Sequence, residues 1–247
     1  MFTPQGPTAR ELTFQALSSV ERGYDLLAEK FDETPFRTPD HLLSAVTDTL
    51  RPLGPFATGL DVCCGTGAGL SVLRTLCTGR VAGVDFSAGM LTEARRAHPT
   101  ATLIRADALA LPFAPVFDLA VSFGAFGHFL PREQVPLFAQ VHASLRPGGR
   151  FAFPLPAPPR VGSPPYWALL GFDAVMRVRN AVWRPRFVMY YRTFRLADVR
   201  ARLERAGFDV SLMAIESLGR REDGSPKCRL VGAEVRKDGH TETRKSP

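Results

Sequence analysis

The first residues whose types and spacing could do chemistry lie in the stretch 59–69, which reads GLDVCCGTGAG. Its apolar beginning predicts a strand, and the turn Gly65-Thr66-Gly67 leads into a helix over about 70–76. Glycines let a backbone turn tightly and approach a ligand closely, and the N–H groups at a helix start favour a negatively charged group. Phosphate-binding and dinucleotide-binding loops share this pattern, so the stretch predicts a ligand loop without naming the ligand.

Three acidic residues follow successive apolar runs and narrow the choice of ligand. Asp61 precedes the loop, where a carboxylate would repel a phosphate but attract an ammonium or sulfonium group. Asp85 lies 20 residues after Gly65 and could accept both hydroxyls of a ribose. Asp107 could accept from the exocyclic amine of an adenine. Open parallel sheets bind ligands at these strand ends, so the acids favour S-adenosylmethionine (SAM) over a pyrophosphate ligand.

The elements that must position these residues alternate between strands and helices, which predicts right-handed βαβ units and a parallel sheet. The predicted strands of this part are 58–63, 81–85, 101–105, 117–122 and 150–153. Two closing runs, 208–218 and 228–235, flank a polar turn and predict an antiparallel hairpin.

Helical spacing of apolar residues predicts further helices outside the alternating part. They cover 12–30, 39–51, 166–182 and 196–206. Thr38 is the expected N-cap of the second of these helices, with Pro39 at its first position.

Five segments, in this order and spacing, resemble class I SAM-dependent methyltransferases, in particular the small-molecule group that includes the ubiquinone- and menaquinone-biosynthesis enzymes. They are GLDVCCGTGAG at 59–69, GVDFSAGML at 83–91, RADALALPF at 105–113, FDLAVSFGAFGHF at 117–129 and LRPGGRFAF at 145–153. The resemblance implies an α/β fold with a Rossmann-like, seven-stranded, mostly parallel sheet of order 3-2-1-4-5-7-6, strand 7 antiparallel. It also implies an N-terminal helical cap over 1–55 and a methyltransferase domain over 56–247, with a helical lid insertion at about 154–194.

Cofactor-binding residues follow from the same resemblance. The glycine loop would approach the methionine part of SAM, Asp85 the ribose, and Asp107 the adenine edge, with S-adenosylhomocysteine (SAH) as the product. The full set is Asp61, Gly65, Thr66, Gly67, Asp85, Phe86, Met90, Asp107, Ala108, Ser122 and Phe123. Cys63 and Cys64 depart from the family pattern, but small side chains suit packing there. No metal is expected, because the remaining histidines lack partners at ligand spacing and no CxxC pair exists.

Methyl transfer from SAM is an in-line displacement, so the protein must mainly position the acceptor. His128 is the candidate general base for a weakly acidic acceptor, or else a wall of the pocket. The candidate acceptor-binding residues are Tyr24, Tyr166, Trp167 and Tyr190. The motif Ser163-Pro164-Pro165-Tyr166 resembles one in amino-directed nucleic-acid methyltransferases, but it follows the fifth strand instead of the fourth.

Charge is the unusual feature of the composition, at a formal +7 with 27 Arg and 4 Lys. Preference for Arg over Lys is typical of a GC-rich genome, yet residues 157–206 hold ten Arg and three acids, the whole excess. This Arg-rich segment would face either solvent, an anionic acceptor, or an anionic membrane surface that holds a lipid acceptor. A nucleic-acid partner is not expected, and the oligomeric state stays open.

Other classes of protein are weighed against these features. A 45% apolar composition excludes a disordered chain. The absence of a long apolar run and of a signal-like start predicts a cytoplasmic protein. A short-chain dehydrogenase would show Tyr-x-x-x-Lys, which none of the tyrosines begins. The prediction is a small-molecule methyltransferase with a hydrophobic or anionic acceptor; an RNA or protein methyltransferase and a non-catalytic SAM-binding protein remain alternatives.

Overall fold

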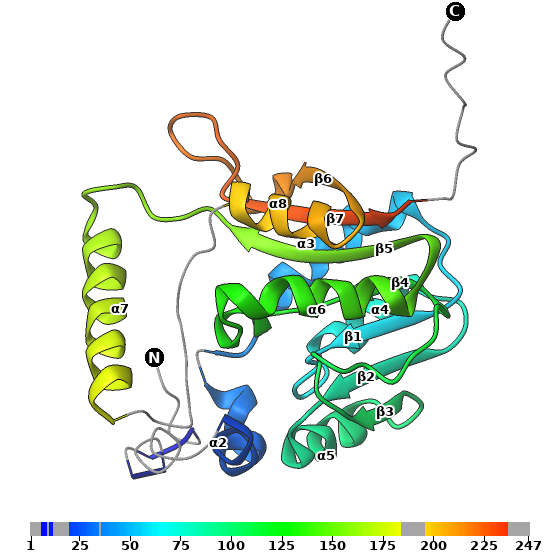
Figure 1. Cartoon of the computed structure of the whole chain (residues 1–247), viewed down its shortest axis with the longest axis horizontal. Coiled ribbons are helices and arrows are strands. Elements are labelled where there is room, and N and C mark those ends of the chain that lie inside the picture. Colours follow the sequence, from blue (N-terminus) through cyan, green and yellow to red (C-terminus); the bar gives the residue numbers. More distant parts are fainter. Residues whose placement is uncertain (1–5, 9, 12–19, 35, 184–195, 237–247) are drawn as a thin grey trace, which may run out of the picture.

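A seven-stranded sheet forms the centre of the molecule (Figure 1). The computed structural model describes residues 6–8, 10–11, 20–34, 36–183 and 196–236. The strand order is β3-β2-β1-β4-β5-β7-β6, and β7 runs antiparallel to both of its neighbours. The strands are β1 (Gly59–Val62), β2 (Val81–Asp85), β3 (Thr102–Arg105), β4 (Phe117–Val121), β5 (Leu145–Pro156), β6 (Phe208–Ala214) and β7 (Cys228–Val235). The predicted fold class is confirmed.

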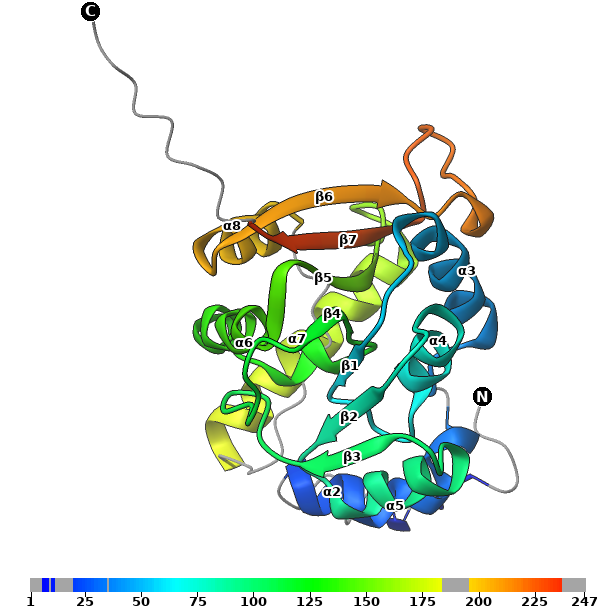
Figure 2. The same ribbon diagram turned by 90° about the vertical axis from the view of Figure 1, so that its right-hand side faces the viewer.

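Helices cover both faces of this sheet, because successive strand residues point to opposite sides. In β5, Phe151 and Phe153 pack with α6 (Pro131–Ser144) and α8 (Leu196–Arg205), whereas Ala152 between them packs with α3 (Asp40–Leu50) and α4 (Ala68–Leu76). Figure 2 shows the sheet between these layers. The helix α5 (Ala88–Ala97) packs on β2 and β3. Both faces are therefore buried in separate apolar clusters.

The N-terminal segment lies across the carboxyl ends of the central parallel strands. It consists of α2 (Val20–Leu27), which packs on α5, and the 3-10 helix η1 (Ala28–Glu33). Short 3-10 turns also occur at η2 (Arg51–Leu53), η3 (Ala125–His128) and η4 (Glu216–Leu218). The predicted helix 12–30 is described only from residue 20, and its end is a 3-10 turn.

Three predicted boundaries are wrong. β5 extends well beyond 150–153, because its second half pairs with β7 up to Pro156. Beyond Ala152 it has no partner in β4, so the prolines there cost no hydrogen bond on that side. The first strand of the hairpin ends at Ala214 instead of 218 and continues as η4. Pro39, in extended conformation, is the N-cap of α3 in place of Thr38.

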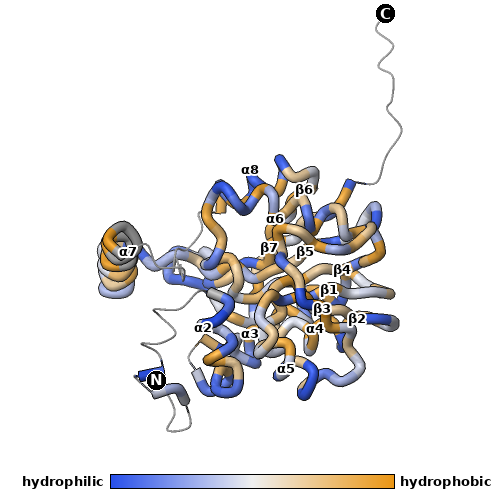
Figure 3. The backbone as a smooth tube through the Cα atoms, turned by 60° about the horizontal axis from the view of Figure 1, so that its bottom comes forward, coloured by the Kyte–Doolittle hydropathy of each residue, from blue (hydrophilic) through white to orange (hydrophobic). Residues whose placement is uncertain are grey.

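One long helix stands apart from the layered body. Along the chain, α7 (Pro164–Trp183) follows β5 and precedes α8. Figure 3 shows it as a separate, mostly apolar tube. It packs closely against none of the other helices and strands in the described part of the chain. Within the same described residues, no helix has both the length and the apolar character needed to cross a membrane.

Candidate functional site

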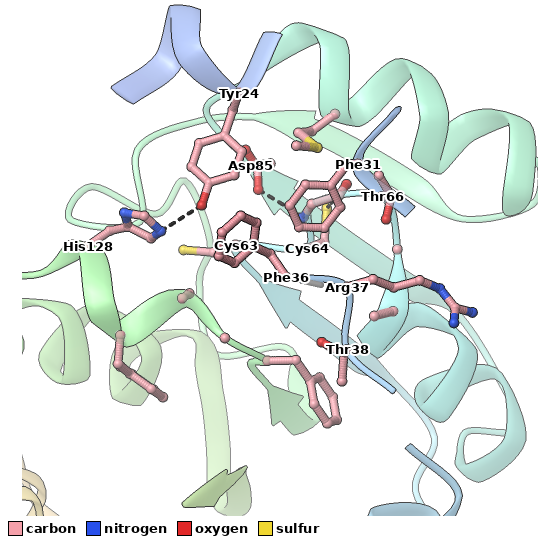
Figure 4. Close-up of a pocket in the computed structure, with 18 of the residues that line it drawn as sticks. Tyr24, Phe31, Phe36, Arg37, Thr38, Cys63, Cys64, Thr66, Asp85 and His128 are labelled. Carbon is pink, nitrogen blue, oxygen red and sulfur yellow. Dashed lines mark hydrogen bonds between the residues drawn. The ribbon is translucent and has the colours of Figure 1, made fainter. Parts of the chain in front are cut away.

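A cavity of about 1220 Å³ lies at the carboxyl ends of β1, β2 and β4, beneath the N-terminal segment (Figure 4). Open α/β sheets bind ligands at this edge. Most of the predicted cofactor residues line it, from four different segments of the chain. These are Gly65, Thr66, Gly67, Asp85, Phe86, Met90, Asp107, Ala108 and Phe123.

The glycine loop needs its glycines for two different physical reasons. Gly65 has φ 52°, and a Cβ there would meet no atom within 4 Å, so the loop presents bare backbone to the open cavity. Gly67 has φ 104° and precedes α4; a Cβ there would lie 2.5 Å from Cδ2 of His98. Cys63 adopts the same left-handed region with φ 57° although it carries a side chain. The loop therefore leaves room for a ligand at Gly65 and packs tightly at Gly67.

Asp85 connects the end of β2 to this loop. Its carboxylate accepts hydrogen bonds from the backbone N–H of Gly65 and of Ser87, both at 2.9 Å. Burial raises the pKa of Asp85, and the N–H groups of Ser87 and Gly65 oppose that shift. Asp107 accepts from the N–H of Leu109 at 2.9 Å and lines the same cavity. The carboxylates of Asp85 and Asp107 can thus accept hydrogen bonds from hydroxyl or amino groups of a ligand.

Two predicted cofactor residues lie behind the cavity wall and do not line it. Asp61 is only 1% exposed and lies under the first turn of α4, where a Cβ on Gly69 would be 2.5 Å from its carboxyl group. Burial, together with the charge of Asp85, raises the pKa of Asp61 well above its usual value. Ser122 is also buried and donates to the carbonyl oxygen of Val62 at 2.8 Å. Both side chains support the strand ends that carry the loop.

Tyr24 and His128 meet in the cavity, although they are 104 residues apart. The Tyr24 hydroxyl and Nε2 of His128 are hydrogen-bonded at 2.7 Å, and their rings meet edge to face with centroids 5.3 Å apart. Figure 4 shows this pair on one side of the cavity, with the Cys63 side chain pointing toward it. Burial and the charges of Asp85 and Asp61 raise the pKa of Cys63 well above its usual value. The Cys63 thiol beside this pair is therefore held in its protonated form.

Sequence reasoning missed a second group of cavity residues. Three of them come from the segment that joins η1 to α3, one from η1 itself, and two from elsewhere: Phe36, Arg37, Thr38, Phe31, Cys63 and His98. Figure 4 shows Phe31 and Phe36 over the cavity and Arg37 pointing away from its centre. The segment 34–39 has no periodic pattern and no motif, so no sequence signal marks it as part of a site.

The predicted acceptor-binding residues are divided by the structure. Tyr24 lines the cavity, whereas Tyr166 and Trp167 lie at the start of α7 and do not line it. Tyr190 lies outside the described residues. Ser163 accepts a hydrogen bond from the N–H of Tyr166 at 3.3 Å, so the Ser-Pro-Pro-Tyr segment forms the beginning of that helix. Among the residues that the structure describes, no cluster of His, Cys, Asp and Glu is arranged to hold a metal ion.

Comparison with known proteins adds to this geometry. Residues 60–149 match a protein family described as a methyltransferase domain. The chain is 38% identical over 101 residues to a 2-phytyl-1,4-naphtoquinone methyltransferase of Thermosynechococcus vestitus, covering 39% of this chain and 44% of the relative. It is 37% identical over 129 residues to a trans-aconitate 2-methyltransferase of Azoarcus sp., covering 51% and 50%. The chain thus spans about half the length of the curated relatives it matches.

The fold has solved counterparts. Human N-acetylserotonin methyltransferase in complex with SAM superimposes with a TM-score of 0.61 at 14% identity, over 93% of this chain and 60% of that one. The strand order and the glycine loop make the fold similar to that of Rossmann-like methyltransferases. The likeness to the methyltransferase-domain family covers the segment 60–149, which holds the glycine loop and Asp85.

Proposed function

We propose that this protein transfers a methyl group from SAM to a small, hydrophobic, hydroxyl-bearing acceptor bound in the cavity. The observation that carries the proposal is that one cavity joins the glycine loop and Asp85 to the Tyr24–His128 pair. Its volume of about 1220 Å³ exceeds the ~300–1000 Å³ typical of a pocket for one small ligand. The cavity therefore has room for a cofactor and an acceptor together.

The residues of the cavity fit SAM. The open space at Gly65 accepts a ligand against bare backbone, and the Asp85 and Asp107 carboxylates are acceptors for ribose hydroxyls and an adenine amine. Phe86 and Met90 supply apolar surface nearby. When bound, SAM supplies a methyl group already activated by its sulfonium. The protein's own residues then bind, orient and exclude water, which is most of what this reaction needs.

A hydrophobic acceptor is favoured by the walls around His128. Aromatic and apolar side chains dominate the cavity wall there, beside the polar side chains of His128, Tyr24 and Glu133. They are Phe123, Phe126, Phe129, Pro154, Leu155 and Pro156. Such a wall excludes water and suits a flat or aliphatic body with one polar group. The two relatives are named for a phytyl-substituted naphthoquinone and for trans-aconitate, which supports a small molecule over RNA or protein.

His128 would act on the acceptor hydroxyl as the general base. Nε2 is hydrogen-bonded to the Tyr24 hydroxyl at 2.7 Å, and an acceptor hydroxyl would replace that hydroxyl and donate its proton to Nε2. In this scheme Nε2 takes that proton as the acceptor oxygen forms its bond to the methyl group. Tyr24 binds the acceptor and holds the imidazole ring through its edge-to-face contact.

The decisive experiment separates binding from transfer. Isothermal titration of SAH measures the cofactor site, and labelled SAM with fractionated metabolite extracts reports the acceptor. His128→Gln should keep SAH affinity within about twofold and lower kcat by ~10²–10⁴, the usual contribution of a general base. Absence of SAH binding by the wild-type protein would refute the cofactor assignment. SAH binding without transfer to any fraction would support a non-catalytic SAM-binding protein instead.

The larger organisation is part of the proposal. We assign residues 1–55 to a cap over the cofactor and 56–247 to the methyltransferase domain, with 154–194 as an insertion on the acceptor side. We also propose a peripheral membrane contact of the Arg-rich segment 157–206, through which a hydrophobic acceptor would arrive.

A further inference from the structure

The helix α7 exposes an unusual amount of apolar surface. Its exposed side chains are large and apolar, and Figures 1 and 3 show the helix standing clear of the sheet. They are Trp167 (59% exposed), Leu169 (36%), Leu170 (47%), Phe172 (42%), Val175 (65%), Val178 (64%) and Val182 (76%). Side chains of this size in water are unfavourable at roughly 1.5–3 kcal/mol each relative to burial. This surface is therefore suited to contact with an apolar partner.

The pattern along α7 shows how much of the helix that partner must cover. Positions 166, 173, 177 and 180 hold Tyr, Asp, Arg and Asn, and at helical spacing they fall on one line. Most other positions of α7 hold apolar residues, which occupy more than half of the circumference of the helix. A helix of 20 residues is about 30 Å long. The cavity mouth could cover one side of such a helix only, whereas an apolar medium could surround it.

Charge selects among the partners. Residues 174–197 contain six arginines and no acidic residue. Two copies of this chain that joined their α7 helices would bring at least the four arginines of the two helices together, which opposes self-association. An anionic lipid surface instead attracts each arginine by about 1 kcal/mol and accepts apolar side chains beneath its headgroups. Long arginine side chains reach the headgroups while their stems lie along apolar surface.

We propose that α7 inserts into the interface of an anionic lipid bilayer and holds the cavity against it. The inference deepens the proposed function, on which it rests for the nature of the acceptor. α7 begins eight residues after Pro156, the last residue of β5 and part of the acceptor wall. A bilayer at α7 is thus connected to the acceptor end of the cavity by a short segment of chain, and a hydrophobic acceptor dissolved in lipid would enter from that side.

Intrinsic fluorescence offers a direct test, because the chain has two tryptophans and both belong to α7, at positions 167 and 183. The full chain is titrated with vesicles of phosphatidylcholine alone and with vesicles containing 30% phosphatidylglycerol. The expected result is a blue shift and co-sedimentation with the anionic vesicles, reversed by high salt, and neither with the neutral ones. SAH titration in the absence of vesicles reports the cofactor site separately.

Two sets of variants identify the surface. Val175→Gln/Val178→Gln/Val182→Gln removes exposed apolar side chains from α7 and should weaken vesicle binding about tenfold or more. The matched control is Val116→Gln, at a valine that is 41% exposed outside α7, which should bind as the wild type does. Arg184→Gln/Arg186→Gln should weaken binding to anionic vesicles by about tenfold or more, whereas Arg74→Gln/Arg80→Gln, on the body of the domain, should not.

Three results would overturn the inference. The first is that the wild-type chain ignores anionic vesicles while it still binds SAH, which would leave the proposed function standing. The second is a lipid-free dimer, seen by sedimentation and abolished by the triple valine variant, which would assign α7 to a second copy. The third is a blue shift caused by SAH and acceptor without lipid, which would assign α7 to closure over its own cavity.

Discussion

Asp61 and Asp85 lie on neighbouring strands, but only one of the two carboxylates faces the cavity. In β1, Leu60 and Val62 point into the α6 side of the core, so the alternation of the strand turns Asp61 toward α4. Asp85 is the last residue of β2 and lines the cavity. Of the two, Asp85 is the one that a ligand can reach, while Asp61 supports the first turn of α4.

Replacement of Asp61 by Asn should change how stability depends on pH. Because the folded-state pKa of Asp61 is raised, ionisation begins in the unfolded chain first, and the free energy of unfolding falls as pH rises above about 4. Asn does not titrate, so Asp61→Asn should be more stable than the wild type at pH 8, with a difference that shrinks toward pH 4. Urea unfolding at pH 4, 6 and 8 measures this. A difference that is constant with pH would contradict the burial of an ionised carboxylate.

We expect the Tyr24 hydroxyl to contribute less to the rate of methyl transfer than His128 does. Tyr24→Phe keeps the edge-to-face ring contact and loses the 2.7 Å hydrogen bond. Loss of one such bond corresponds to about 0.5–1.5 kcal/mol, so kcat/KM should fall about 2- to 12-fold, mainly through KM. A loss as large as that of His128→Gln would instead show that Tyr24 itself transfers the proton.

At the scale of elements, the N-terminal segment is held over the cavity by carboxylates. Asp25 in α2 accepts from the Ser87 hydroxyl at 2.6 Å and from the N–H of Gly89 at 2.9 Å, which ties α2 to the start of α5. Asp32 accepts from the Thr66 hydroxyl at 2.8 Å, which ties η1 to the glycine loop. The segment therefore covers the cavity through contacts that also position the loop.

Asp25→Ala should loosen this attachment. Two lost hydrogen bonds at an exposed site amount to about 1–2 kcal/mol, and SAH affinity should fall several-fold because the segment covers its site. Limited proteolysis near residues 20–38 and SAH titration measure the two effects. The control is Asp48→Ala on α3, whose side chain is 70% exposed and forms an ion pair with Arg51 of η2. If Asp25→Ala behaves like this control, α2 is not held by Asp25.

The fit between α4 and β1 can be tested with one methyl group. Gly69→Ala would place a Cβ 2.5 Å from the Asp61 carboxyl group and should destabilise the protein by about 1–3 kcal/mol, as overpacking does. Gly171→Ala, in the exposed helix α7, meets no atom within 4 Å and should stabilise by up to about 1 kcal/mol. Thermal unfolding measures the stability of both variants. Equal changes in stability would mean that α4 is not closely packed against Asp61.

For the whole molecule, the sheet and its cavity form one body and α7 an appendage to it. None of the α7 side chains that the structure describes lines the cavity. Replacing 160–190 by a short Gly/Ser linker should therefore leave SAH affinity and folding nearly unchanged while abolishing acceptor turnover. Loss of SAH binding in a folded replacement would assign these residues to the cofactor site instead of the acceptor side.

What the sequence by itself determined is local in origin. Strand alternation, glycines at left-handed positions and acids at strand ends leave a pattern within a few residues, so the parallel sheet and the loop at Gly65 could be predicted. The strand order was predicted only from the resemblance to a known family. The tertiary structure alone decided which distant groups meet. It paired Tyr24 with His128, brought Phe36 and Arg37 to the cavity, turned Asp61 beneath α4, and left α7 without a close partner among the described elements. These contacts depend on how the helical layers pack on the sheet, and the spacing of residues along the chain does not predict that packing.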